Sequence, residues 1–233
     1  MSQKNLEEFE KKIGIGFNDK NLLKQVFVHR SYLNENVGFD LDHNERLEFL
    51  GDAVLELIVT EFLYNQYKNP EGELTNWRSA LVRGEALSEI ANSLGIEEFL
   101  YLSKGEQKSG GKARQIILAN TFEALVGAIF LDQGIDITKK FISKVLLTKV
   151  PSVIKDKLYL DPKSHLQELS QAQTGLTPVY KILTQYGPDH AKSFTVGVFI
   201  GDKFKSEGSG SSKRAAEESA ASSALERWTE LNN

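Results

Sequence analysis

The chain has 233 residues, 40% of them hydrophobic, which is enough for one large domain or for a larger domain with a smaller one. It contains no cysteine, which excludes disulfides and a thiolate zinc site and fits a reducing, cytosolic compartment. The formal net charge of −4 and the pI of about 5.7 argue mildly against nucleic-acid binding, because such proteins are usually basic. Any nucleic-acid surface must therefore be a local arrangement of basic residues.

The N-terminal segment, residues 1–12, is polar and charged and lacks the apolar core of a signal peptide. The longest apolar run, residues 116–131, is interrupted by Asn120, Thr121 and Glu123. It falls short of the ~20 apolar residues that a membrane-spanning helix needs. We therefore expect a soluble, cytoplasmic protein without membrane contact.

The first part of the chain is predicted to be helical. Apolar residues recur at helical spacing over 47–58 and 81–94, and Asn69-Pro70, Gly95 and Gly110-Gly111 are expected to end helices. We expect an all-α domain over residues 5–134, with helix extending to about residue 150.

The pattern changes after Pro151, and we expect a linker over 151–160 and a second domain over 161–230. The second domain should be a small α+β domain of order α-β-β-β-α, with helices over 164–173 and 213–231. Its strands are predicted over 179–185, 193–200 and 203–207, followed by a loop over 208–212. The second strand should bury one face, and Ala216, Ala220 and Ala224 should pack closely on the sheet.

Acidic residues occur where a buried helix is expected. Glu45, Glu48 and Asp52 share one helical stripe within an otherwise apolar segment. Like charges repel, and burying them unpaired is costly, so a divalent cation such as Mg²⁺ would resolve both problems. The alternative is that the stripe is an ordinary solvated face.

Glu123 presents the same conflict in the run 116–131, where it is the only charged residue, with Asn120 one turn earlier. Packing the two helices side by side would join Asn120 and Glu123 to the first stripe. The alternative is a buried salt bridge, with the candidate partners Arg46, Arg78 and Arg83. The residues alone therefore support no more than an acidic site for a divalent metal.

Residues 44–52, NERLEFLGD, match without a break the nine-residue signature of the ribonuclease III family, which the chain resembles. The segments 29–32 (HRSY), 78–82 (RSALV) and 123–129 (EALVGAI) resemble other blocks of the family in the same order. The C-terminal part is similar to a double-stranded RNA-binding domain, on the segments 161–164 (DPKS), 187–190 (GPDH) and 210–217 (GSSKRAAE).

The resemblance implies an all-α catalytic domain of the ribonuclease III fold that forms a homodimer. Phe49 matches the aromatic residue that the family inserts into its partner subunit; the alternative is an ordinary core phenylalanine. The metal cluster implied is Glu48, Asp52, Asn120 and Glu123, and Asp52 and Glu123 are implied to be catalytic. Glu45 is expected at the edge of the site, in contact with substrate or with the metal ligands.

The implied reaction is Mg²⁺-dependent cleavage of double-stranded RNA, with Mn²⁺ as a substitute metal and no small-molecule cofactor. Its products carry 5′-phosphate and 3′-hydroxyl ends with short 3′ overhangs, and its role is the processing of rRNA, mRNA and tRNA. The four histidines show no zinc-ligand spacing. Asn120 departs from the family, which usually has Asp there, so the alternative function is a catalytically weakened double-stranded RNA-binding protein.

The expected RNA contacts of the second domain lie on three surfaces, because duplex RNA is recognised through its shape, phosphates and 2′-hydroxyls. The first helix offers side-chain amides, the loop between the first two strands offers a histidine, and the start of the last helix favours phosphate. The residues concerned are Gln167, Gln171, His190, Ser212, Lys213 and Arg214.

Overall fold

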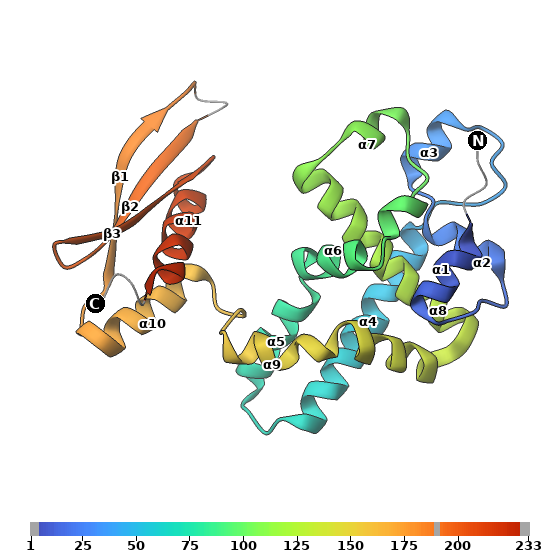
Figure 1. Ribbon diagram of the computed structural model, residues 1–233, viewed down its shortest axis with the longest axis horizontal. Coiled ribbons are helices and arrows are strands. Elements are labelled where there is room, and N and C mark those ends of the chain that lie inside the picture. Colours follow the sequence, from blue (N-terminus) through green and yellow to red (C-terminus); the bar gives the residue numbers. More distant parts are fainter. Residues whose placement is uncertain (1–4, 189–191, 229–233) are drawn as a thin grey trace. The chain divides into compact units, whose positions relative to one another are not determined.

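The computed structural model describes residues 5–188 and 192–228 (Figure 1). The chain divides into two compact units, Met1–Asp156 and Lys157–Asn233. The first unit is helical and the second combines three antiparallel strands with two helices, which confirms the predicted fold classes. His190, one of the predicted RNA contacts, lies outside the described residues.

The first unit is built from helices of very different length. Two long helices, α4 and α8, pack against each other, and the shorter helices surround them (Figure 1). The elements in chain order are α1 (Leu6–Ile13), α2 (Lys20–Val26), α3 (Arg30–Glu35), α4 (Glu45–Gln66), α5 (Glu71–Val82), α6 (Gly84–Ser93), the 3₁₀ turn η1 (Ile96–Phe99), α7 (Lys104–Lys108), α8 (Gly111–Val145), the 3₁₀ turn η2 (Leu147–Lys149) and α9 (Val150–Lys155).

Helix α8 is the centre of this unit, and most of its side chains between Ile117 and Ile129 are buried. It is interrupted at Gly134, whose backbone angles (φ 78°, ψ 177°) are not helical. By length and composition alone, one stretch in the described part of the chain, Gly111–Lys155, could cross a membrane, contrary to the expectation from sequence. Inside the fold, however, 61% of its apolar window is buried, as expected of the core helix of a helical domain.

The boundary between the units differs from the expected linker over 151–160. Pro151 occupies the first turn of helix α9, where its missing N–H costs nothing, and α9 packs against α5. Val150 and Val153 are buried there. The first unit therefore continues to Asp156, and the first half of the predicted linker is helix.

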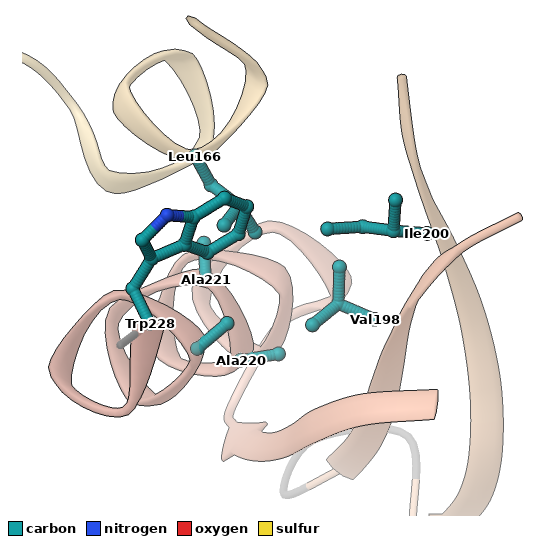
Figure 2. Packing of buried hydrophobic residues seen from close by; sticks show 7 residues of the cluster. Leu166, Val198, Ile200, Ala220, Ala221 and Trp228 are labelled. Atoms are coloured by element: carbon teal, nitrogen blue, oxygen red, sulfur yellow. The ribbon is translucent and has the colours of Figure 1, made fainter. Parts of the chain in front are cut away.

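The second unit consists of α10 (Pro162–Thr174), β1 (Pro178–Tyr186), β2 (Ser193–Ile200), β3 (Lys203–Gly210) and α11 (Lys213–Glu226). The strand order is β1-β2-β3, all antiparallel. The predicted apolar face of β2 is buried, and so is the alanine stripe of α11. Figure 2 shows Val198 and Ile200 of β2 facing Ala220 and Ala221, with Leu166 of α10 and Trp228 closing the core.

Strand β3 extends three residues further than predicted, through Gly208, Ser209 and Gly210, which the sequence suggested were loop. Helix α11 crosses these residues so closely that a Cβ atom on Gly208 would lie 2.1 Å from the backbone nitrogen of Ala220. A Cβ on Gly210 would lie 2.6 Å from that of Ala216. The glycines are therefore needed for close packing between strand and helix rather than for a turn.

Candidate metal cluster and RNA-binding surface

Two glycines set the distance between helices α4 and α8. A Cβ atom on Gly51 of α4 would lie 1.8 Å from the backbone oxygen of Glu123, and one on Gly127 of α8 would lie 2.3 Å from that of Leu47. Neither position tolerates a side chain without movement of a backbone, so the helices are in direct contact at this crossing. Both glycines lie within segments that resemble the family, but this role was not predicted from the sequence.

The crossing brings together the acids that the sequence placed on separate helices. The pKa of Glu123 is raised to about 7, by burial first and then by the charges of Asp52 and Glu48. Burial also raises the pKa of Glu48, as do the charges of Glu45 and Asp52, while a hydrogen bond from the Asn120 side chain opposes the shift. Asp52 and Glu45 are exposed, whereas Glu48, Asn120 and Glu123 are half-buried.

The salt-bridge alternative for Glu123 is wrong within the described part of the chain. No ion pair there involves Glu48, Asp52 or Glu123. Two of the arginines considered as partners are engaged elsewhere: Arg78 donates a hydrogen bond to Thr60 and Arg83 lies 3.8 Å from Glu85. The acids at the crossing therefore lack a protein cation to compensate them.

The residues at the crossing fit a hard divalent cation, which prefers carboxylate and amide oxygens. They supply three carboxylates and the Asn120 amide oxygen, and burial together with mutual repulsion explains the raised pKa of Glu123. Among residues 5–188 and 192–228, however, no three His, Asp or Glu side chains already converge as a closed metal cage. Carboxylates that repel one another are expected to close only around a cation.

Glu45 lies at the edge of this cluster, one turn before Glu48. Its carboxylate is 3.3 Å from the guanidinium of Arg30 and 3.7 Å from the imidazole of His43. Its charge nevertheless contributes to the raised pKa of Glu48. The structure therefore places Glu45 beside the cluster with a cationic partner of its own, whereas the other acids have none.

The residues before α4 anchor its first turn. The buried Asn44 side chain donates to the backbone oxygen of Val26, 2.9 Å away, and its backbone N–H donates to that of Val28. Nearby, Ser31 Oγ accepts from the backbone N–H of Ser103, and the His29 imidazole caps α3 by accepting from Ser31 N–H. His29, Ser31 and Asn44 lie in segments that resemble the family, but their anchoring role was not predicted from the sequence.

Phe49 is not part of the core of this chain. Its side chain is 82% exposed, and on the same helix Leu57 and Tyr64 are 60% and 71% exposed. The alternative of an ordinary core phenylalanine is therefore wrong. An exposed apolar row on one helix is typical of a surface that a partner covers.

The predicted RNA contacts on α10 and α11 are all at the surface. Gln167 and Gln171 are exposed, and Gln171 donates to Thr177 Oγ1. Ser212 caps α11 by accepting from the backbone N–H of Ala215, so its hydroxyl oxygen has a structural role that the sequence analysis did not include.

The two basic residues at the start of α11 differ. Lys213 is exposed and forms no ion pair within the described residues, whereas Arg214 Nε lies 2.8 Å from Glu218 Oε1, one turn along the helix. This pair was not predicted from the sequence, although i, i+4 spacing of opposite charges is a known signal for it.

Comparisons with known proteins agree with this architecture. Residues 19–150 match the family model "Ribonuclease-III-like", and residues 162–227 match the model "Double-stranded RNA binding motif". Ribonuclease 3 of Streptococcus thermophilus is 43% identical over 222 residues, which cover 95% of this chain and 96% of the relative. Ribonuclease 3 of Nitratiruptor sp. is also 43% identical, over 223 residues and the same shares of both chains.

Solved structures support the same assignment for the first unit. The nuclease domain of ribonuclease III from Campylobacter jejuni is 39% identical, with a TM-score of 0.57, and the match covers 64% of this chain and 98% of that domain. Another structure of that domain describes flexibility in a region involved in dimer formation. The chain therefore belongs to the ribonuclease III family and is an endoribonuclease that acts on double-stranded RNA.

Proposed function

We propose that this endoribonuclease uses Mg²⁺, with Mn²⁺ as a substitute, to hydrolyse phosphodiester bonds of duplex RNA into 5′-phosphate and 3′-hydroxyl ends with short 3′ overhangs. One observation carries the proposal: acids gather at the Gly51–Gly127 crossing without a protein cation. A requirement for metal is general in this family. The proposal includes a cytoplasmic location and the processing of rRNA precursors and other transcripts.

In this mechanism Glu48, Asp52, Asn120 and Glu123 would hold the cation. Once bound, a divalent cation lowers the pKa of water and stabilises the charge that develops on the phosphate and the leaving 3′ oxygen. Asn120 orients Glu48 through its hydrogen bond, and Asp52, the most exposed of the four, faces the solvent from which RNA arrives. Because its pKa is raised to about 7, Glu123 is partly protonated near neutral pH and must be ionised to act as a ligand.

The same proposal includes a homodimer with one cluster per subunit. The exposed row Phe49, Leu57 and Tyr64 on α4 is the surface that a second copy would cover. Beside it, α4 and α5 leave a hollow of about 460 Å³ whose lining includes Leu63, Tyr64 and Leu74. This hollow is a candidate place for the partner's aromatic side chain.

The assembly is tested by light scattering. Phe49→Ser should shift the full-length protein from dimer toward monomer mass. The control is Phe204→Ser, which removes a half-exposed aromatic in the second unit and should leave the mass unchanged. A dimer that persists in Phe49→Ser at low concentration would contradict this part of the proposal.

Asn120 supports a second candidate, a double-stranded RNA-binding protein with weakened catalysis. An amide oxygen coordinates Mg²⁺ without contributing charge, so the cluster has three carboxylates. The three remaining acids favour the enzyme, because a protein that only binds RNA gains nothing from Glu123 in so unfavourable an environment.

One experiment separates the two candidates. Purified full-length protein is incubated with a long RNA duplex in Mg²⁺, in Ca²⁺ and in EDTA, and both binding and product ends are measured. We expect cleavage only in Mg²⁺, and binding in all three conditions. Cleavage in EDTA would overturn the metal mechanism, and binding without cleavage in Mg²⁺ would establish the second candidate.

A further inference from the structure

The three-stranded sheet of the second unit has one covered face and one open face. Helices α10 and α11 pack on the covered face, which holds the core shown in Figure 2. The open face carries apolar side chains that the rest of the unit does not cover. Val179 and Leu183 of β1 are 49% and 42% exposed, and Phe204 of β3 is 51% exposed. Exposed apolar side chains that adjoin one another are typical of a surface that a partner covers.

These side chains adjoin one another around Gly197, in the middle of β2. A Cβ atom on Gly197 would lie 3.1 Å from a methyl carbon of Leu183 and 3.2 Å from the rings of Phe199 and Phe204. The two rings pack edge to face, with 5.5 Å between their centroids. Glycine at 197 therefore allows its neighbours to close over β2. We call Val179, Leu183, Phe199 and Phe204 the apolar patch.

One basic and one acidic residue flank the patch. Lys181 of β1 and Glu207 of β3 both pair with Gly197, from opposite sides, so the three residues form one row across the sheet. Lys181 and Glu207 are exposed, and neither forms an ion pair among residues 5–188 and 192–228. The ammonium group of Lys181 lies 4.9 Å from the centre of the Phe199 ring, and thus on the open face. The row therefore carries opposite charges on its two sides.

This arrangement is complementary to itself. If a two-fold axis runs along the middle of β2, each Lys181 lies opposite the partner's Glu207, because both residues are one strand away from β2. Two ion pairs then form, one on each side of the axis. In the next row, Val179 lies opposite the partner's Phe204, and Phe199 lies opposite its own copy. Apolar residues thus face apolar residues, and opposite charges face each other.

We propose that the open face of this sheet is a contact between the second units of two copies of the chain. Two sheets pack face to face through side chains of this kind. The contact is weak alone, because the patch is small and its ion pairs are exposed. Pairing through α4 would raise the local concentration of second units, which favours a weak contact. The mass at low concentration is set by α4.

The inference goes beyond the proposed function, because it requires neither metal nor RNA. The RNA contacts predicted on α10 and α11 belong to the helices, which pack on the covered face of the sheet. Contact between two open faces therefore leaves these helices available for RNA.

The test is cross-linking of the full-length chain, which has no cysteine, so that one introduced thiol is the only site for a short bismaleimide. Thr195 lies on β2 two residues before Gly197, on the proposed axis, and should face its own copy. Thr195→Cys should therefore give a cross-linked pair of chains. Glu226→Cys is the control, at an exposed position of α11, and should cross-link roughly tenfold more slowly. Equal rates for the two variants would overturn the inference.

Charge reversal then tests the proposed pairing. In the Thr195→Cys background, Lys181→Glu turns both ion pairs into repulsions and should slow cross-linking roughly tenfold, as should Glu207→Lys. The two changes together exchange the charges and keep the net charge of the parent, so cross-linking should recover. A double variant that stays as slow as the single variants would overturn the proposed arrangement.

Lys181→Gln and Glu207→Gln provide the same readout if a reversed charge unfolds the protein. Each removes both attractions without adding a repulsion, so each should slow cross-linking by about two- to fivefold. An unchanged rate in both would reject the role of the charges. Light scattering and cleavage of the same samples report on the homodimer through α4 and on the proposed function, whereas cross-linking at position 195 reports on the sheet alone.

Discussion

The α4–α8 crossing and the start of α11, which we propose meet the same duplex RNA, are stabilised in opposite ways. At the crossing the backbones are in contact at Gly51 and Gly127, and the acids are left without a protein cation. At the start of α11 the side chains are exposed and their partners are local: Ser212 caps the helix by accepting from the backbone N–H of Ala215, and Arg214 pairs with Glu218.

The difference follows from what each region must do. A metal cluster needs its ligands at fixed distances, and backbone contact fixes distances at the cost of electrostatic repulsion. A phosphate-binding surface tolerates movement, because affinity depends on charge near the RNA more than on geometry. We therefore expect mutations at the crossing to act on the chemical step and on stability together, and mutations on α11 to act on affinity alone.

The most damaging change should be Gly51→Ala. The new Cβ would lie 1.8 Å from the backbone oxygen of Glu123, so the helices must separate and the acids move apart. Cleavage should fall at least ~10²-fold, as for displacements of about 1 Å in other enzymes, and the free energy of unfolding should fall by about 1–3 kcal/mol. Cleavage rates and denaturant unfolding measure the two effects.

Gly72→Ala is the matched control for that change. Gly72 lies in the first turn of α5, where nothing is within 4 Å of a Cβ, so Ala should leave cleavage unchanged and stabilise by about 0.5–1 kcal/mol. Near-normal cleavage by Gly51→Ala would show that the crossing does not fix the cluster.

Glu123→Gln should abolish cleavage, by about 10²–10³-fold or more, and yet stabilise the protein without metal. Because the pKa of Glu123 in the folded protein is about 7, above its ordinary value of 4.5, folding favours the protonated acid. Stability is therefore lost as pH rises from about 4.5 to 7. In EDTA the variant should melt at a higher temperature than the parent, with a larger gain at pH 8 than at pH 5.

Glu56→Gln serves as the control, because Glu56 is an exposed acid on α4. It should change neither cleavage nor melting temperature appreciably. If Glu123→Gln is less stable than the parent at pH 8, the Glu123 carboxylate has a cationic partner in solution. The α4–α8 crossing would then not differ from α11 in lacking ion pairs.

Asn120→Asp tests how the number of carboxylates at the α4–α8 crossing affects metal binding and stability. A fourth carboxylate favours the bound cation, so the Mg²⁺ concentration for half-maximal cleavage should fall roughly tenfold. The added charge also increases repulsion in the metal-free protein, so the melting temperature in EDTA should fall. If the cleavage rates of parent and variant depend on Mg²⁺ concentration in the same way, the Asn120 amide already supplies what this position requires. If only the variant cleaves RNA, the natural protein is the second candidate, a double-stranded RNA-binding protein with weakened catalysis.

The smallest effect is expected for Glu218→Gln on α11. The change releases Arg214 from its ion pair and removes a negative charge near the RNA, so duplex binding should tighten roughly two- to fivefold and depend more steeply on salt. Glu226→Gln, an exposed acid at the other end of the same helix, should have less effect. Equal tightening by both variants would indicate a general charge effect without a role for the Arg214 pair.

The sequence predicted what periodicity and composition encode. The spacing of Glu48 and Asp52, and the isolation of Glu123 in an apolar run, were sufficient to predict that the acids meet, and alternation along β2 predicted its buried face. The close approach of a helix backbone to a glycine could not be predicted in the same way, because glycine is typical both of such contacts and of turns. Gly208 and Gly210 were therefore interpreted as loop, although helix α11 crosses them in a strand.

The hydrogen-bond and ion-pair partners of individual side chains were harder still to predict. The cap at Ser212 and the ion pair from Arg214 to Glu218 use two residues, Ser212 and Arg214, that were predicted only as RNA contacts. Proline at 151 suggested a linker, because proline is common in connecting segments as well as in the first turn of a helix. Such choices depend on tertiary contacts, here the packing of α9 on α5.

The break in α8 at Gly134 affects how the first unit unfolds locally. Gly134 adopts backbone angles that are essentially restricted to glycine, so the helical hydrogen-bond ladder ends on one side of it and begins again on the other. Before the break, Asp132 accepts from the backbone N–H groups of Asn18 and Asp19, which ties that half of the helix to the N-terminal helices. Hydrogen exchange should therefore divide α8 into two cooperative units, with slow amides around Asn120 and Glu123 and faster amides beyond Gly134.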